Sequence, residues 1–134
     1  MSSPPLTVSP EDSLENAIDL LQKHNIRELP VVEHGKLIGI VTDRDLREIA
    51  PSYPVFRDQQ EIRHYLQKLK VASAMTVDPW VVSPDTPLVE AARLLQTYRI
   101  GSLPVVQGNE LVGIISVTDF LKLFIEKNRK GIHQ

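Results

Sequence analysis

Two short strings in the sequence combine residue types that can hold a sugar or a phosphate. They are GIVTDRD at residues 39–45 and GIISVTD at residues 113–119. Each has a glycine, two apolar residues, a hydroxyl residue and, three positions after the hydroxyl residue, an aspartate. A hydroxyl group can donate a hydrogen bond to a phosphate or sugar oxygen. A carboxylate can accept hydrogen bonds from both hydroxyls of a ribose.

Each string lies where an expected strand runs into an expected helix. Free backbone N–H groups and the helix dipole attract anions at such a helix N-terminus, so phosphate, ribose and an apolar slot for a base together describe a nucleotide. The same spacing suits a helix cap equally well. In that interpretation Thr42 or Ser116 satisfies free N–H groups, and Asp45 or Asp119 favours the positive end of the dipole. The residues alone leave both interpretations open.

The two strings belong to an internal repeat. Residues 1–50, shifted by 74 positions, align without a gap to residues 75–124 with 19 identities in 50 pairs. Unrelated sequences of average composition would give roughly three. We therefore predict a first repeat at residues 1–50, a helical connector at 51–74, a second repeat at 75–126 and a polar tail at 127–134.

The expected helices of the two repeats carry start signals. In the first repeat Asp12 is the expected N-cap, and apolar residues at helical spacing begin with Leu14. In the second repeat Thr86 is the expected N-cap, Pro87 takes the first helical position, and the apolar face begins with Leu88. A further helix is expected in the connector at Gln59–Leu69.

Each helix is followed by two apolar runs that predict a β-hairpin. The expected turns contain His34-Gly35 and Gly108-Asn109, where glycine and asparagine tolerate the positive φ of a tight turn. The resulting unit is β-α-β-β-α. Because a unit of about 50 residues with few aromatics is too small to be stable alone, we expect the two units to pack together. The predicted fold class is therefore α/β (α+β).

Composition excludes several classes of function. The chain has 134 residues, no cysteine, and a net charge of −2 with acidic and basic residues interspersed. The charge argues against a nucleic-acid or anionic-membrane partner, and the lack of cysteine excludes disulfides and thiolate metal sites. The N-terminus resembles no signal peptide, and no stretch is long enough to cross a bilayer. The expected location is the cytoplasm.

The sequence offers no catalytic residue or metal site. Asp43 and Asp45 lack the further oxygen ligands and the glycine of a calcium loop. The histidines are scattered without the spacing of metal ligands: His24, His34, His64 and His133. No nucleophile or acid–base pair has a persuasive context, so we expect that the chain is not an enzyme and requires no cofactor.

The repeat, the Leu-Pro-Val-Val strand and the Gly-apolar-apolar-Thr/Ser-x-x-Asp string resemble the cystathionine-β-synthase-type (CBS) domain family. The resemblance covers about residues 1–125, and the first repeat with its connector is similar to bacterial acetoin-utilisation-type CBS proteins. It implies two β-α-β-β-α repeats packed as a pseudo-two-fold pair, with two clefts between them. It also implies that Asp45 and Asp119 hold ribose, with Thr42 and Ser116 near ribose or phosphate.

Other candidates for lining a nucleotide site depend on the same resemblance. Family pockets use the segment just before the Pro-Val-Val strand, and an arginine can supply a phosphate-facing cation, although each arginine taken singly is expected to be a solvated surface residue. Thr7 would line the base pocket through its backbone. The full set is Thr7, Arg27, Leu29, Arg44, Arg99, Ser102 and Thr118. The repeats differ at Arg27 and Gly101, which predicts two unequal sites.

The resemblance implies a regulatory module that binds AMP, ADP, ATP or S-adenosylmethionine. Such a ligand would shift the arrangement of the repeats, which an unidentified partner protein would detect in trans. Homodimerisation is the family habit. The alternative is a scaffold in which the aspartates serve only as caps, the clefts hold no ligand, and the dimer interface is the function.

Overall fold

The structure, a computed structural model, describes residues 5–49 and 59–129. Those residues divide into two compact units, a first unit spanning Leu6–Pro79 and a second unit made of Pro5 and the residues from Trp80 onward. The start of the expected connector, residues 51–58, and most of the expected tail lie outside the described residues. Within the described part, no helix is both long enough and apolar enough to cross a membrane.

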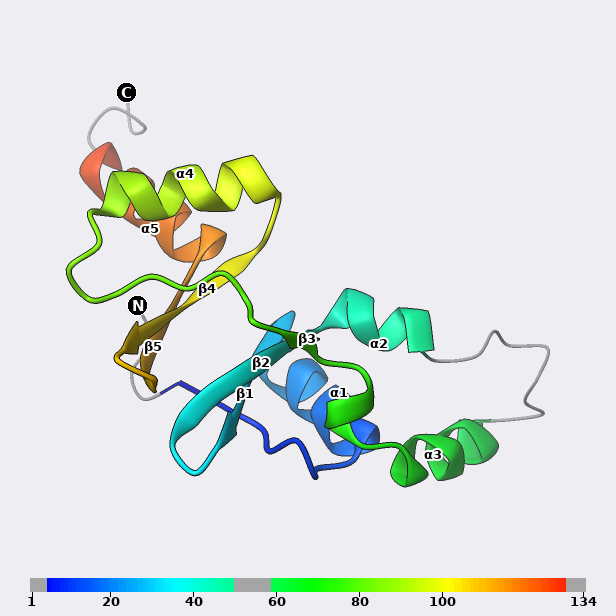
Figure 1. The fold of residues 1–134 in the computed structure, drawn as a ribbon. Coiled ribbons are helices and arrows are strands. Elements are labelled where there is room, and N and C mark those ends of the chain that lie inside the picture. The colour runs from blue at the N-terminus through cyan, green and yellow to red at the C-terminus, as the bar shows by residue number, and fades with distance from the viewer. Residues whose placement is uncertain (1–4, 50–58, 130–134) are drawn as a thin grey trace. The chain divides into compact units, whose positions relative to one another are not determined.

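The first unit is a helix, a β-hairpin and a second helix, followed by the connector (Figure 1). Its elements are α1 (Leu14–His24), β1 (Glu28–Glu33), β2 (Lys36–Thr42), α2 (Asp43–Ile49), α3 (Gln59–Lys68), a 3-10 turn η2 (Val71–Ser73) and β3 (Thr76–Val77). The hairpin turns at His34 and Gly35, both with positive φ (53° and 79°), as a tight hairpin requires. The predicted hairpin and the predicted connector helix are confirmed.

The second unit repeats the same order. Its elements are α4 (Leu88–Tyr98), β4 (Ser102–Gln107), β5 (Glu110–Ser116) and α5 (Val117–Lys127). Both hairpins are antiparallel, with a register irregularity at the same place, between Val31 and Val32 and between Val105 and Val106. The short extended segment that opens each repeat forms a single parallel bridge to the hairpin's first strand, through Val8 and through Val82. The mixed α/β class is confirmed.

The N-caps of the two first helices differ from those predicted. The N-cap of α1 is Ser13, whose hydroxyl accepts from the Asn16 N–H at 3.0 Å. Asp12 instead accepts from the Ser9 N–H at 2.8 Å, which closes the preceding turn. In the second unit the N-cap is Pro87, which has no side-chain cap. Asp12 and Thr86, the predicted N-caps, therefore accept hydrogen bonds within the two Ser-Pro turns instead.

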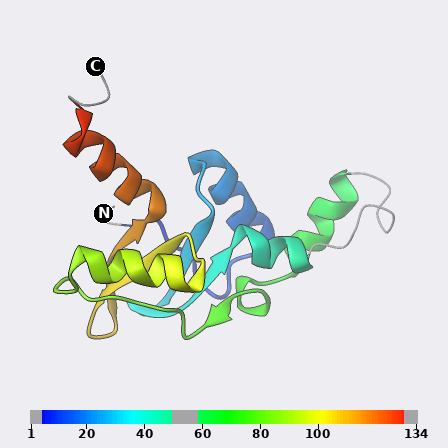
Figure 2. The same cartoon turned by 90° about the horizontal axis from the view of Figure 1, so that it is seen from above.

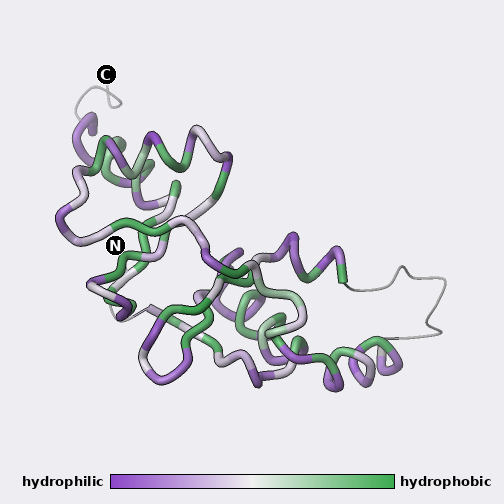
Figure 3. The backbone as a smooth tube through the Cα atoms, viewed as in Figure 1, coloured by the Kyte–Doolittle hydropathy of each residue, from purple (hydrophilic) through white to green (hydrophobic). Residues whose placement is uncertain are grey.

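Apolar side chains of the first unit form a core between the hairpin and α1, and Figure 3 shows its strands as largely apolar stretches. Leu14, Ala17 and Val31 are fully buried. The connector contributes to the same core, because Val71 is fully buried and Leu66 is 7% exposed. The core of the first unit therefore includes residues from outside the repeat itself.

The connector is attached to the first repeat by its backbone as well. The Val71 N–H donates to the carbonyl of Asp12 at 2.8 Å, and the Ala72 N–H donates to the carbonyl of Pro10 at 3.0 Å. The Leu69 carbonyl accepts from the Leu14 N–H at 2.9 Å. These bonds satisfy a free amide at the start of α1 and fix the connector along the N-terminal end of that helix.

The second unit has a smaller core. Its buried side chains are Val82, Ala91, Leu95, Leu103, Val105 and Ile115. The sequence predicts Leu88 on the buried face of α4, but the structure leaves this residue 54% exposed, whereas its repeat equivalent Leu14 is fully buried. Among the described residues of α5, none is buried.

Gly39 of β2 is required by a close backbone approach. β3 pairs antiparallel with β2, with Thr76 opposite Ile40 and Val77 opposite Gly39. A Cβ at Gly39 would lie 2.8 Å from the Thr76 carbonyl oxygen and 3.0 Å from Sδ of Met75. The glycine that opens the first string therefore allows β3 to pair with β2. The sequence did not predict β3.

Candidate functional site

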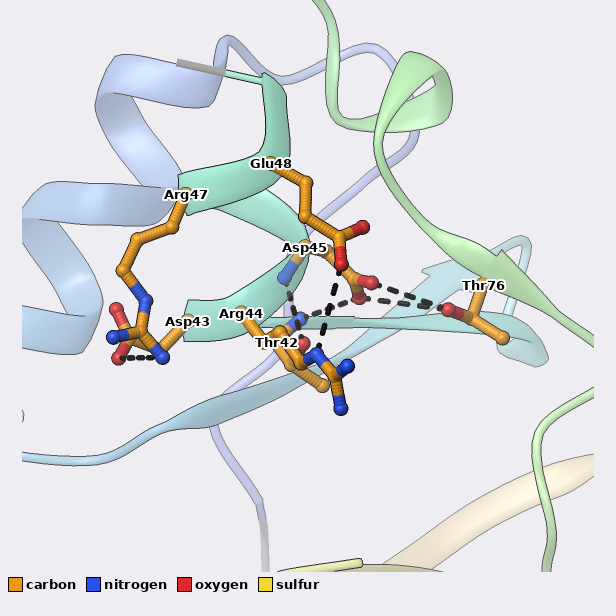
Figure 4. Close-up of polar contacts among 7 residues, drawn as sticks. All are labelled: Thr42, Asp43, Arg44, Asp45, Arg47, Glu48 and Thr76. Carbon is orange, nitrogen blue, oxygen red and sulfur yellow. Dashed lines mark hydrogen bonds and ion pairs between the residues drawn. The ribbon is translucent and has the colours of Figure 1, made fainter. Parts of the chain in front are cut away.

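The hydroxyl and aspartate of the first string form a reciprocal cap at the start of α2 (Figure 4). The Asp45 N–H donates to Oγ1 of Thr42 at 3.0 Å, and the Thr42 N–H donates to Oδ2 of Asp45 at 3.0 Å. Both residues are half-buried. The capping interpretation is therefore correct for this pair. The cap fixes the Asp45 carboxylate at the strand-to-helix junction.

Thr76 of β3 extends this site. Figure 4 shows its hydroxyl facing the Asp45 carboxylate, with Oγ1 lying 3.5 Å from each carboxylate oxygen. A contact of that length is weak, so Oδ1 of Asp45 has only a long contact. Sequence reasoning missed Thr76 because its position depends on the pairing of β3 with β2; the glycine at position 39 was the available signal.

The second string forms the same arrangement at the start of α5. The Ser116 N–H and the Ser116 hydroxyl donate to Oδ2 of Asp119 at 2.8 and 3.1 Å, and the Asp119 N–H donates to Oγ of Ser116 at 3.2 Å. All of these bonds to the carboxylate reach Oδ2. In both repeats, therefore, capping uses mainly one carboxylate oxygen and directs the other away from the cap.

Ser102 adds a buried hydroxyl beside the second cap. It lies opposite Ser116 in the β4–β5 pairing, so the two side chains are on the same face of the hairpin. Ser102 is only 4% exposed, and its Oγ has no hydrogen-bond partner in the described part of the chain. A buried hydroxyl without a partner costs about 1–3 kcal/mol, so this atom is available for an acceptor or donor from outside the chain.

The backbone before each hairpin closes against the same helix start. The Arg27 carbonyl accepts from the Asp43 N–H at 2.8 Å, and the Gly101 carbonyl accepts from the Val117 N–H at 3.0 Å. The Arg27 side chain is exposed. The structure thus brings the backbone of residue 27 to the first string, and that of residue 101 to the second.

The side chains of the other two candidate arginines make no described contact with the caps. Arg44 follows Thr42 by two positions, but its side chain is 84% exposed and its Nε lies 3.6 Å from Oε1 of Glu48, one helical turn on. Arg99 is the C-cap of α4 and has a left-handed backbone (φ 53°), with an exposed side chain. Neither arginine makes a described contact with the capping aspartate of its own repeat.

The remaining predicted residues have mixed positions. Leu29 is fully buried in the core of the first unit, so only its backbone can face a ligand. Thr7 is exposed and precedes the bridge residue Val8, and Thr118 is exposed in the first turn of α5. The described residues include no group of three or more His, Cys, Asp or Glu side chains placed to hold a metal ion.

Comparison with known proteins decides the family. The model of the CBS domain family matches residues 1–52 and 71–126. The chain belongs to the CBS domain family. Its two matched segments carry the two capping strings, and the predicted resemblance is confirmed.

Two curated relatives differ in the share of their own length that the similarity covers. A CBS domain-containing protein of Dictyostelium discoideum is 37% identical over 131 residues, which cover 94% of this chain and 88% of that protein. Inosine-5'-monophosphate dehydrogenase of Korarchaeum cryptofilum is 38% identical over 115 residues, covering 85% of this chain but only 21% of the enzyme. The similarity to the enzyme is therefore confined to a minor part of it.

Solved CBS structures share the fold. An acetoin utilization protein of Vibrio cholerae has a TM-score of 0.80 at 32% identity, covering 100% of this chain and 93% of its own. A CBS domain pair in complex with 5'-methylthioadenosine and S-adenosyl-L-methionine has a TM-score of 0.75 at 31% identity, covering 95% and 93%. A CBS protein in complex with AMP has a TM-score of 0.79 at 28% identity, covering 96% and 94%.

Proposed function

We propose that this CBS pair is a regulatory module that binds an adenosyl ligand, AMP, ADP, ATP or S-adenosylmethionine, at the start of α2 and of α5. The observation that carries the proposal is that only one oxygen of the Asp119 carboxylate takes part in the helix cap. Oδ2 accepts both hydrogen bonds that Ser116 donates to this carboxylate, which leaves Oδ1 for the hydroxyls of a ribose. Capping and ligand binding are then two uses of one side chain rather than alternatives.

The buried hydroxyl of Ser102 supports the same site. It lies on the same hairpin face as Ser116 and lacks a partner among the described residues, so a polar atom of a ligand would relieve its desolvation cost. Related structures in complex with AMP, or with 5'-methylthioadenosine and S-adenosyl-L-methionine, support the adenosyl class. They leave the choice among its members to experiment.

The two sites are expected to differ in affinity. The first has Thr76 beside Asp45, whereas the second has the unpartnered hydroxyl of Ser102 beside Ser116, as far as the described residues extend. A ligand at the second site gains a new bond for a buried group, while one at the first competes with Thr76. We therefore expect the tighter site at the start of α5.

Calorimetric titration of the chain with AMP, ADP, ATP and S-adenosylmethionine tests the proposal. Asp119→Ala should weaken the preferred ligand at least tenfold, because the ribose loses its acceptor. Ser13→Ala is the matched control, since it removes a cap of similar geometry from α1 and should leave affinity unchanged. If no adenosyl ligand binds, or if both variants bind equally well, the aspartates serve as caps alone.

A ligand-free dimerisation scaffold is the second candidate function. It is favoured by α5, on which several large apolar side chains are exposed: Val117, Leu121, Leu123, Phe124 and Ile125. Monomeric proteins rarely expose large contiguous apolar patches. Light scattering of the chain, alone and with ligand, distinguishes a ligand-independent homodimer from a module whose assembly responds to the ligand.

A further inference from the structure

Asp119 borders an apolar groove of the second unit. The groove has a volume of about 610 Å³, which is within the range of about 300–1,000 Å³ that is usual for small-molecule sites. Its floor includes Ala91 of α4 and Val105 and Ile115 of the hairpin. Figure 2 shows α5, in orange and red, diverging from α4. All of the lining residues belong to the second unit, so the groove continues the ligand site at the start of α5.

One face of α5 carries the charged groups that line this groove. They are Asp119, Lys122 and Glu126, whose spacings of three and four positions place them on the same side of the helix. Neither Lys122 nor Glu126 has an ion-pair partner among the described residues. Beyond Asp119, the groove therefore presents an unpaired ammonium group and an unpaired carboxylate about one helical turn apart.

The start of α5 is poorly suited to a phosphate group. The Val117 N–H donates to the Gly101 carbonyl at 3.0 Å, and the Asp119 N–H donates to Oγ of Ser116 at 3.2 Å. Two of the first three amides of the helix are therefore occupied, although free amides are what attract phosphate to a helix N-terminus. The described lining residues include two carboxylates and one lysine, so their net charge of −1 repels a polyphosphate.

The two opposite charges instead match an α-amino acid. Such a group carries an ammonium and a carboxylate on one carbon atom, and in S-adenosylmethionine and S-adenosylhomocysteine it is joined through sulfur to the 5′ carbon of adenosine. Glu126 lies two helical turns beyond Asp119, about 10 Å along the helix axis. With the ribose on Asp119, the amino-acid part of the ligand would extend along α5, over the apolar side chain of Leu123.

The first repeat lacks this pair of charges. A shift of 74 positions takes Lys122 to Glu48 and Glu126 to Ser52. Glu48 has the opposite charge to Lys122, and its Oε1 lies 3.6 Å from Nε of Arg44. The repeat therefore supplies the ribose acceptor twice, whereas the charge pair is specific to α5 and is not required by the architecture of the unit.

We propose that the groove along α5 is an amino-acid subsite that makes the second site selective for S-adenosylmethionine over adenine nucleotides. The inference rests on the proposed function, because Asp119 must hold the ribose. Glu126 pairs with the α-ammonium group of the ligand, and Lys122 pairs with its α-carboxylate. The sulfonium adds a positive charge that complements the net negative charge of the groove.

Calorimetric titration with four ligands tests this selectivity. The Asp45→Asn variant is used, because it lacks the charged ribose acceptor of the first site but keeps an oxygen that can cap α2. S-adenosylmethionine and S-adenosylhomocysteine should bind about tenfold more tightly than 5′-methylthioadenosine, which has the sulfur but no amino acid. ATP should bind more weakly than all three. If circular dichroism shows that Asp45→Asn perturbs the fold, the unmodified chain is titrated and Asp119→Ala identifies the second site.

Two variants of α5 locate the amino-acid subsite. Lys122→Met and Glu126→Gln should each weaken S-adenosylmethionine by about threefold, as expected for exposed ion pairs. Both should leave 5′-methylthioadenosine unchanged, because that ligand has no group to pair with either side chain. Glu110→Gln is the matched control for charge, since Glu110 is an exposed glutamate of the same unit that does not line the groove. It should change the affinity of neither ligand.

The outcomes separate this proposal from the function on which it rests. If 5′-methylthioadenosine or ATP binds as tightly as S-adenosylmethionine, the amino-acid subsite is refuted and the adenosyl site stands. The same holds if Glu126→Gln affects S-adenosylmethionine and 5′-methylthioadenosine equally, or no more than Glu110→Gln does. If none of the four ligands binds, both the subsite and the proposed function are refuted.

Discussion

Alanine at the equivalent leucines of the two repeats should have unequal effects on stability. Leu14 is fully buried under the connector, and Leu88 is 54% exposed. Leu14→Ala removes three methylene equivalents from a packed core, for which the free energy of unfolding falls by about 3–4 kcal/mol when the cavity is included. Leu88→Ala loses roughly half of a transfer term of about 0.8 kcal/mol per methylene group, or about 1 kcal/mol.

The comparison is well controlled because each leucine is the first residue of an 11-residue helix. Changes in helix propensity and in the unfolded state are therefore similar, and the difference of about 2–3 kcal/mol measures the connector's cover. Urea unfolding followed by far-ultraviolet circular dichroism reports on both units. Fluorescence of Trp80, the chain's single tryptophan, which stacks on Tyr98 with ring centroids 4.1 Å apart, reports on the second unit.

The reasoning would be refuted if the two variants lost equal stability. Equal losses of about 3 kcal/mol would mean that Leu88 is covered in solution. Equal losses near 1 kcal/mol would mean that the connector does not stay on the first unit. Thermal unfolding gives an independent check, with about 3–5 °C expected per kcal/mol for a chain of this size.

Three further substitutions, one of them with a matched control, test individual contacts. Ser102→Ala should raise ligand-free stability by up to about 1 kcal/mol, since it removes an unpaired buried hydroxyl, and should weaken an adenosyl ligand in calorimetry. Gly39→Ala should destabilise by about 1–3 kcal/mol, because its Cβ meets the Thr76 carbonyl; Gly35→Ala, which meets nothing within 4 Å, should cost about 1 kcal/mol through its positive φ. Ser13→Ala should lower stability by about 1 kcal/mol in urea titration, as loss of an N-cap does.

The repeat predicted most of the local structure because short-range patterns specify it. The apolar runs on either side of His34-Gly35 predict a hairpin, and β1 and β2 form it around that turn. Thr42 and Asp45, three residues apart, form the cap that their spacing suggested. These interactions are completed within a few residues, so a sequence window of that length contains them.

Contacts between distant residues were not predictable in this way. The start of α1 is fixed partly by the Leu69 carbonyl, which accepts from the Leu14 N–H. No sequence pattern near Leu14 indicates that bond. The exposure of Leu88 was missed for the same reason, because its helical pattern matches that of Leu14, whose burial involves the distant residues Leu66 and Val71 of the connector. Thr76 was missed because strand pairing brings it to Asp45 from 31 positions away.

The dependence of the first core on Leu66 and Val71 has a consequence for synthesis. The first repeat cannot complete its core when residue 50 has been made, because the side chains of Leu66 and Val71 follow up to 21 residues later. At 5–20 residues per second, the nascent chain carries an open apolar surface for roughly 1–5 s. A chaperone that recognises extended apolar segments would have its best opportunity in that interval.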